Sequence, residues 1–163
     1  MRSMVLSLLV ENNSGVLSRV SGLFTRRGYN IDSISAGTTM DPDYTRITIV
    51  SSGEDEELEQ IRKQVAKLVE VVDIKELPAE TSVSRELVLV KVEADATRRS
   101  QVIAVADIFR AKIVDVAEHS LILELTGNAS KLEAFINLLK DFRILDICRT
   151  GLTSMPRGAA DEK

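Results

Sequence analysis

The residues best placed to do chemistry lie in a short polar turn near the start of the chain, Asn12-Asn-Ser-Gly15, just before an apolar-periodic segment that begins at Val16. The start of a helix offers unpaired backbone N–H groups and about half a positive charge, so an anionic group can dock there. Gly15 allows close approach to the backbone, and Asn12 or Asn13 can supply side-chain donors and acceptors. These groups suit both ends of a small zwitterion, and equally a well-capped helix without a ligand.

The other reactive side chains of the chain have simple structural explanations. His119 lies in Ala117-Glu-His-Ser120, which is predicted to be a hairpin turn, and the single cysteine, Cys148, lies in an apolar segment that is expected to bury it. No His, Cys and carboxylate set has metal-ligand spacing, and no Gly-rich phosphate loop or Gly-x-Ser-x-Gly elbow occurs. The sequence therefore predicts no catalytic residue and no metal site, which argues against an enzyme acting alone.

Two charged runs are also best explained by structure. The acidic run Glu54-Asp-Glu-Glu57 suits the first turn of a helix, where the helix dipole favours negative charge. Arg98-Arg99 stands at a predicted helix start, against the dipole. This pair can mark a contact with an acidic partner, but an exposed pair in solvent is the simpler interpretation.

The composition sets limits on the class of protein. The chain has 163 residues, 44% of them apolar, enough for a core, and a net charge of -4 without a basic block. Nucleic-acid binding needs clustered Lys and Arg, and Trp is absent, so a nucleic-acid partner is not expected. One cysteine fits a reducing compartment, and no apolar run approaches the roughly 18 residues that span a membrane. The sequence therefore predicts a cytoplasmic protein with no membrane partner and no signal peptide.

The first half of the chain has the periodicity of six alternating elements. Apolar or alternating runs predict strands, and apolar residues three and four apart predict helices. The expected order is strand, helix, strand, strand, helix, strand, over Met4–Val10, about 15–27, 30–38, 44–51, a helix from about Asp55, and Val71–Leu77. Asn13 or Ser14 is expected to cap the first helix, and Gly28 to end it in a left-handed conformation.

The second half repeats this order, with a helix capped by Asn128. The expected elements are Leu87–Val92, Thr97–Arg110, Ile113–Val116, 121–125, the helix after Asn128, and Ile144–Cys148. The chain is therefore predicted to be an α+β protein of two ferredoxin-like βαββαβ domains, each an antiparallel sheet with both helices on one face. The predicted bounds are 1–77 for the first domain, 78–84 for a linker and 85–163 for the second domain.

Several segments carry a resemblance to a known family. Asn12-Asn-Ser-Gly-Val-Leu17 followed by Arg27-Gly-Tyr-Asn-Ile31 resembles the regulatory ACT domain of the small subunit of acetolactate synthase, also called acetohydroxyacid synthase. The resemblance continues in order through Phe109-Arg-Ala-Lys-Ile-Val-Asp-Val116 to Arg149-Thr-Gly151. It covers nearly the whole chain. The tail Met155–Lys163 matches no segment that we can use and is expected to be mobile.

The resemblance implies a regulatory subunit in branched-chain amino acid biosynthesis. Such a subunit binds the catalytic large subunit, raises its activity and makes it sensitive to feedback by valine or a related amino acid. The reaction is the condensation of two pyruvates to 2-acetolactate, or of pyruvate with 2-oxobutyrate. Thiamine diphosphate, magnesium and FAD are expected on the catalytic subunit, and this chain is expected to bind no cofactor.

The resemblance also implies a homodimer through ACT domains, with the first loop of one chain facing the start of the second strand of its neighbour. The residues that match the family's effector site are Asn12, Gly15, Val16 and Leu17 from one chain, and Asn30 and Ile31 from the other. The backbone amides of Gly15 and Val16 would meet the effector carboxylate, Asn12 and Asn30 its head group, and Leu17 and Ile31 its branched side chain.

Three alternatives remain open at this point. A free-standing ACT-domain sensor of amino acids with another client enzyme would share the first loop. A pair of ferredoxin-like domains can also bind RNA, which low aromatic content and negative charge disfavour. An enzyme in its own right is the weakest alternative because the sequence offers no catalytic set.

Overall fold

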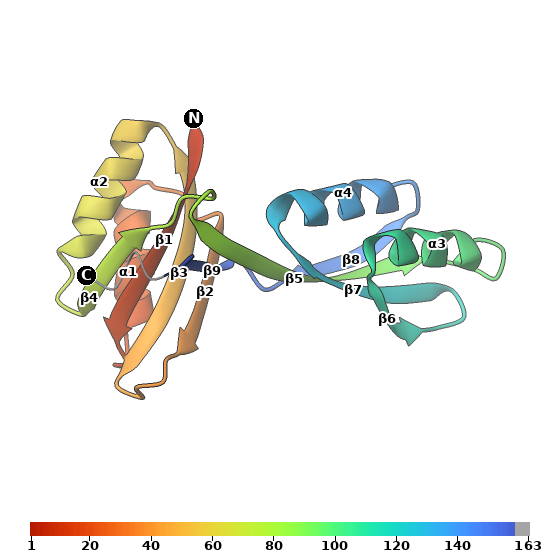
Figure 1. Cartoon of the computed structure of the whole chain (residues 1–163), viewed down its shortest axis with the longest axis horizontal. Helices are drawn as coiled ribbons and strands as arrows, with labels where there is room; N and C mark the ends of the chain where they lie inside the picture. Colours follow the sequence, from red (N-terminus) through yellow and green to blue (C-terminus); the bar gives the residue numbers. More distant parts are fainter. Residues whose placement is uncertain (159–163) are drawn as a thin grey trace. The chain divides into compact units, whose positions relative to one another are not determined.

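A computed structural model describes residues 1–158 and divides the chain into two compact units (Figure 1). Unit 1 consists of Met1–Ser84 and Leu152–Lys163, of which residues 159–163 lie outside the described part, and unit 2 consists of Arg85–Gly151. Each unit contains an antiparallel sheet and two helices, so the prediction of two βαββαβ domains is confirmed.

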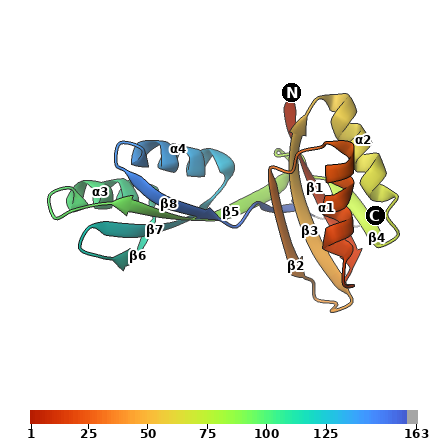
Figure 2. The ribbon, with the colours of Figure 1, turned by 180° about the vertical axis from the view of Figure 1, so that it is seen from behind.

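Unit 1 is a four-stranded antiparallel sheet with both helices on the same face (Figures 1 and 2). The strands lie in the order β2-β3-β1-β4, so that β2 and β4 form the edges of this sheet. The elements are β1 (Arg2–Glu11), α1 (Val16–Arg27), β2 (Ser33–Thr38), β3 (Tyr44–Gly53), α2 (Asp55–Ala66) and β4 (Val71–Glu76).

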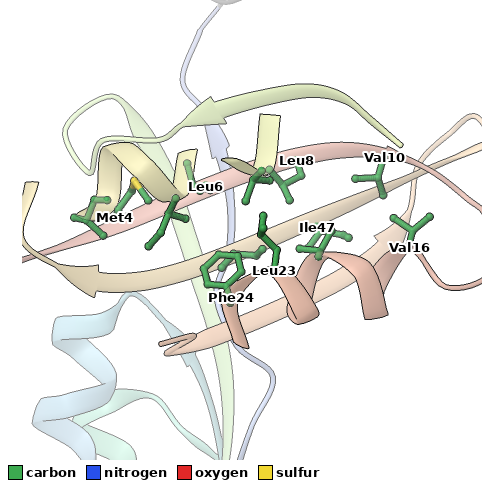
Figure 3. Packing of buried hydrophobic residues seen from close by; sticks show 13 residues of the cluster. Met4, Leu6, Leu8, Val10, Val16, Leu23, Phe24 and Ile47 are labelled. Carbon is green, nitrogen blue, oxygen red and sulfur yellow. The ribbon is translucent and has the colours of Figure 1, made fainter. Parts of the chain in front are cut away.

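The core of unit 1 fixes α1 against the sheet. Alternate residues of β1 point toward the helices, and they pack with Val16, Phe24 and Ile47 (Figure 3). The buried residues of β1 are Met4, Leu6, Leu8 and Val10. Burial of one such apolar side chain stabilises the fold by about 1.5–3 kcal/mol. The position of the first turn of α1 is therefore set by Val16, which is buried at its start.

The structure confirms the predicted end of α1 but not its predicted N-terminal cap. Gly28 ends the helix with φ of 70°, and its N–H donates to the carbonyl oxygens of Phe24 and Thr25, which confirms the left-handed end. The predicted cap by Asn13 or Ser14 is wrong. The residue before the helix is Gly15, with φ of 85° and no side-chain cap, and Asn13 Nδ2 donates to Glu11 Oε2.

A ninth strand, absent from the sequence-based prediction, returns the chain to unit 1. β9 (Thr153–Pro156) pairs with the early part of β5 (Ser82–Glu93), where Ser154 Oγ lies 2.7 Å from Ser84 Oγ. The N–H of Leu152 donates to Ser33 Oγ at 2.9 Å. These hydroxyl contacts hold the segment on unit 1 rather than with the second domain.

The structure bears on two expectations about the end of the chain. The second domain was expected to run over residues 85–163, and this bound stays a prediction, although residues 152–158 group with unit 1 by their contacts. The tail from Met155 was expected to be mobile, but its first residues form β9, and Arg157 Nε donates to the carbonyl oxygen of Ser82. The rest of that expectation concerns residues 159–163, which lie outside the described part.

Unit 2 has the same architecture, with strand order β6-β7-β5-β8. Its other elements are α3 (Arg99–Phe109), β6 (Lys112–Val116), β7 (Ser120–Gly127), α4 (Ala129–Leu139) and β8 (Ile144–Arg149). Val88, Val90 and Val92 of β5 are buried against the helices. Asn128 caps α4 as predicted, because its side chain accepts a hydrogen bond from the Lys131 N–H.

The prediction that Cys148 is buried is wrong, since the cysteine is exposed. It lies opposite Leu89 on the edge strand β8, and the alternation of β5 turns Leu89 away from the helices that cover Val88 and Val90. Among the helices of residues 1–158, none is long and apolar enough to cross a membrane.

Candidate functional site

The first loop of unit 1, Asn12–Gly15, leaves its backbone at Gly15 accessible to a ligand. Gly15 has φ of 85°, and no atom beyond its own residue and its two chain neighbours lies within 4 Å of the position that a Cβ would take. No acidic residue stands in the first turn of α1, and no side chain caps it. The N–H groups of a first turn have no partner within the helix, so this turn can accept an anion from outside. The Val16 N–H makes one long contact, 3.4 Å to the Asn13 carbonyl oxygen.

Asn12 has a role that the sequence did not predict. Its Nδ2 donates to the carbonyl oxygen of Pro42 at 2.9 Å, and its Oδ1 accepts from Thr45 Oγ1 at 3.2 Å. Its backbone N–H donates to the carbonyl oxygen of Asp43 at 2.8 Å. Asn12 therefore ties the first loop to the β2–β3 turn. One hydrogen on Nδ2 still remains for a ligand, because a carboxamide carries two.

Val16 and Leu17 are the apolar residues of this turn, and they differ in exposure. Val16 is buried in the core, so its side chain anchors the helix and offers its backbone to the loop. Leu17 is half exposed beside it. An exposed leucine next to open N–H groups gives the turn both an anion-binding and an apolar component.

Asn30 and Ile31 lie at the opposite end of α1. Asn30 Nδ2 donates to Asp32 Oδ1 at 3.0 Å, and Ile31 is partly buried against the core. The twelve residues of α1 rise about 1.5 Å each, which places these two residues roughly 18 Å from the first loop along the helix. One chain therefore does not bring the six predicted site residues together.

A small open cavity of about 130 Å³ lies beside Asn30. It is lined by Gly28, Tyr29, Asn30, Ser51, Ser52, Glu57 and Ile61. Its hydroxyl groups bond to the protein itself, since Ser51 Oγ donates to the Asn30 carbonyl oxygen at 2.6 Å and Tyr29 OH donates to Gln60 at 3.1 Å. This cavity is therefore a weaker candidate than the first loop.

The two charged runs noted in the sequence take structural roles. Glu54 and Glu57 form a capping box at the start of α2. Arg98 stacks on Phe142 with 4.7 Å to the ring centroid, and Arg99 donates to the carbonyl oxygens of Ala117 and Glu118. Within residues 1–158, no group of three or more His, Cys, Asp or Glu side chains is arranged to hold a metal ion.

Both halves of the chain match models of one family. Residues 6–73 match the ACT domain of small subunits of acetohydroxyacid synthase, and residues 85–158 match the model described as the small subunit of acetolactate synthase. The chain belongs to the family of acetolactate synthase small subunits. The second match reaches residue 158, so it includes β9, which the sequence had left outside the resemblance.

Individual relatives agree with this assignment over nearly the full length. The chain is 52% identical over 153 residues to the acetolactate synthase small subunit of Mycobacterium bovis, covering 94% of this chain and 91% of the relative. It is 46% identical over 156 residues to the probable acetolactate synthase small subunit of Methanothermobacter thermautotrophicus, covering 95% of this chain and 93% of the relative.

A solved structure agrees with the fold as well. The small subunit of acetolactate synthase from Thermotoga maritima superposes with a TM-score of 0.88 at 42% identity, over 98% of this chain and 100% of that chain.

In the present chain, Asn12 joins the first loop to the β2–β3 turn. Its partners Pro42, Asp43 and Thr45 were not predicted from the sequence. The sequence shows a turn-rich segment around Pro42, but that segment alone does not reveal a contact with Asn12.

Proposed function

We propose that this small subunit regulates acetolactate synthase by carrying an effector site for valine or another branched-chain amino acid. It binds the catalytic large subunit, raises its transferase activity and confers feedback inhibition. The observation that carries the proposal is the open first turn of α1, with Gly15 at φ of 85° and no side-chain cap. The backbone amides of Gly15 and Val16 receive the effector carboxylate.

The site is completed by a second copy of the chain. β2 is an edge strand of its sheet, so its outer backbone groups can pair with an identical strand in a two-fold dimer. Asn30 and Ile31 just before β2 then reach the first loop of the partner, and the roughly 18 Å along α1 within one chain no longer separates them. Asn12 and Asn30 bind the head group, and Leu17 and Ile31 surround the aliphatic side chain.

The chemistry itself belongs to the large subunit in this proposal. That subunit holds thiamine diphosphate, magnesium and FAD and condenses two pyruvates, or pyruvate with 2-oxobutyrate. The small subunit supplies no catalytic group, and the complex works in the cytoplasm. Regulation requires that the effector prefers one state of the complex, and a preference of about 1–3 kcal/mol changes the affinity roughly 5- to 150-fold.

The test is reconstitution with the large subunit encoded in the same genome. Acetolactate formation by the purified large subunit is measured alone, then with this chain, and then with increasing valine, leucine or isoleucine. We expect activity to rise on addition of the chain and to fall again with one of the amino acids. If the two chains do not co-purify and activity does not rise, the chain is a sensor with another client.

A further inference from the structure

Four exposed large apolar side chains of unit 1 belong to segments at the end of the sheet where β1 stops: Leu17, Met40, Val69 and Val72. The last residue of β1 pairs with the start of β3, and the preceding residue pairs with the start of β4. The β2–β3 turn and the α2–β4 turn therefore lie at the same end of the sheet, on either side of the end of β1, as Figure 1 shows. Leu17 belongs to the proposed effector site, and we name Met40, Val69 and Val72 the apolar end.

The turn that carries Met40 is ordered by its own hydrogen bonds. Thr39 Oγ1 donates to the carbonyl oxygen of Asp41 at 2.8 Å, and the Asp43 N–H donates to Asp41 Oδ1 at 3.0 Å. The Tyr44 N–H donates to the Asp41 carbonyl oxygen at 3.1 Å. Met40 itself is fully exposed. Because the turn is already ordered, its backbone loses little entropy when a partner covers it, and the entropy cost falls on the Met40 side chain.

The apolar end is bonded to the first loop from both sides. Asn12 holds the β2–β3 turn through Pro42 and Asp43. On the other side, the Glu11 N–H donates to the carbonyl oxygen of Glu70 at 2.9 Å, directly after Val69. An effector that shifts the loop at Gly15 therefore acts on the β2–β3 turn through Asn12 and on the α2–β4 turn through Glu11.

The charge around Met40 favours a basic partner over a second copy. Asp41 and Asp43 flank the turn and are exposed. A two-fold contact centred on this turn would bring the Asp41 and Asp43 carboxylates of the two copies close together. Like charges across an interface cost affinity, whereas Lys or Arg around an apolar recess would complement this turn.

We propose that the apolar end is the surface on which the catalytic large subunit docks. This inference rests on the proposed function and adds the surface and the chemistry of the partner: an apolar recess that receives Met40 and Val69, with basic residues at its rim. The effector loop and the docking surface are then adjacent, and the signal travels through Glu11 and Asn12.

The experiment titrates the purified large subunit with full-length variants of this chain. The double variant Met40→Ser, Val69→Ser removes the apolar contacts, and both side chains are so exposed that the fold does not depend on them. The matched control is Ile108→Ser, since Ile108 of unit 2 is 72% exposed and Val69 is 88% exposed. We expect the concentration for half-maximal activation to rise about tenfold or more in the double variant and to change less than about twofold in the control.

The outcomes separate this inference from the proposed function. If wild type does not activate the large subunit, the proposed function fails. If wild type activates and the double variant reaches half-maximal activation at the same concentration, the docking inference fails alone. Sedimentation of the free chains is the second measurement. Loss of the wild-type dimer in the double variant would assign the apolar end to contact between two copies and would overturn the inference.

Discussion

The two units share an architecture but differ at the loop before their first helix. In unit 1, Gly15 precedes α1 with a positive φ and no side-chain cap. In unit 2, the loop before α3 is closed by its own residues, since Asp95 Oδ1 accepts from the N–H groups of Thr97 and Arg98. Arg99 then bonds to the β6–β7 turn.

This difference leaves the helix start open in one copy of the fold and filled by a side chain in the other. A carboxylate at the loop of unit 2 already occupies the place where an external anion would bind to backbone N–H groups. In unit 1 that place stays free, so the effector site is proposed there and not in unit 2. The shared architecture therefore does not imply a shared function.

The largest expected effect comes from breaking the two cores separately. Phe24→Ala in unit 1 and Phe135→Ala in unit 2 each remove a fully buried ring, at a cost of about 3–5 kcal/mol in the free energy of unfolding. Both tyrosines, Tyr29 and Tyr44, lie in unit 1, so urea unfolding followed by tyrosine fluorescence reports that unit.

Circular dichroism reports both units in the same samples. We expect Phe24→Ala to move the fluorescence transition to lower urea, and Phe135→Ala to move part of the dichroism transition without moving fluorescence. Equal shifts of both signals in Phe135→Ala would mean that the units unfold together, and the comparison of two separate units would then lose its basis.

The next effect concerns the anion site. Gly15→Asp places a carboxylate where the effector carboxylate is proposed to bind, and like charges in contact cost several kcal/mol. We expect inhibition by valine to need on the order of 100-fold more valine or more. The measurement is the inhibition curve of the reconstituted enzyme.

Two controls separate charge from backbone strain. Gly15→Ala keeps the strain of a side chain at φ of 85°, about 1–2 kcal/mol, without the charge. Ala96→Asp places the same carboxylate in the exposed loop of unit 2 and should leave the curve unchanged. Normal inhibition of the Gly15→Asp enzyme would show that the effector binds elsewhere.

Helix capping gives a smaller contrast. Asn128 Oδ1 accepts the Lys131 N–H at 3.0 Å, so Asn128→Ala is expected to lower the free energy of unfolding of unit 2 by about 1 kcal/mol. Asn13 does not cap α1, and Asn13→Ala should therefore stay within about 0.5 kcal/mol of wild type. Urea unfolding of both variants checks the pair. A larger loss in Asn13→Ala would contradict the uncapped start of α1.

The smallest effect depends on pH. Hydrogen bonds from the Thr97 hydroxyl and then from the Arg98 N–H hold the pKa of Asp95 below its ordinary value. A lowered pKa means that the folded state favours the ionised carboxylate, so this stabilisation is present above about pH 4 and is lost as the pH falls through the lowered value. In urea unfolding at a series of pH values, Asp95→Asn should reduce the loss in the free energy of unfolding of unit 2 as the pH falls below about 4. An unchanged curve would show that Asp95 contributes nothing.

Much of the fold follows from local patterns in the sequence. The alternation of Leu6, Leu8 and Val10 and the helical spacing of Val20, Leu23 and Phe24 report burial directly, because one face of each element must be apolar. Gly28 and Asn128 were predictable as helix ends because their function depends on residues within one turn.

The features that were missed depend on contacts between distant residues. β9 was missed because its partner strand β5 begins about 70 residues earlier and because it has no apolar pattern, with Ser154 bonded to the Ser84 hydroxyl. The exposure of Cys148 follows from its place on an edge strand, which an apolar segment does not reveal. The first loop stays a predicted site, and the hydrogen bond from Asn12 to the Pro42 carbonyl oxygen was not predicted.

Mixing two defective chains tests the two-chain effector site most directly. Gly15→Asp damages the first loop and Ile31→Asp damages the part proposed to come from the neighbour. The two purified variants are unfolded, combined in equal amounts, refolded and titrated calorimetrically with valine. We predict that neither variant alone binds valine and that the mixture does, because a mixed dimer restores one of its two sites. If wild type binds valine and the mixture does not, the site lies within a single chain and the account is wrong.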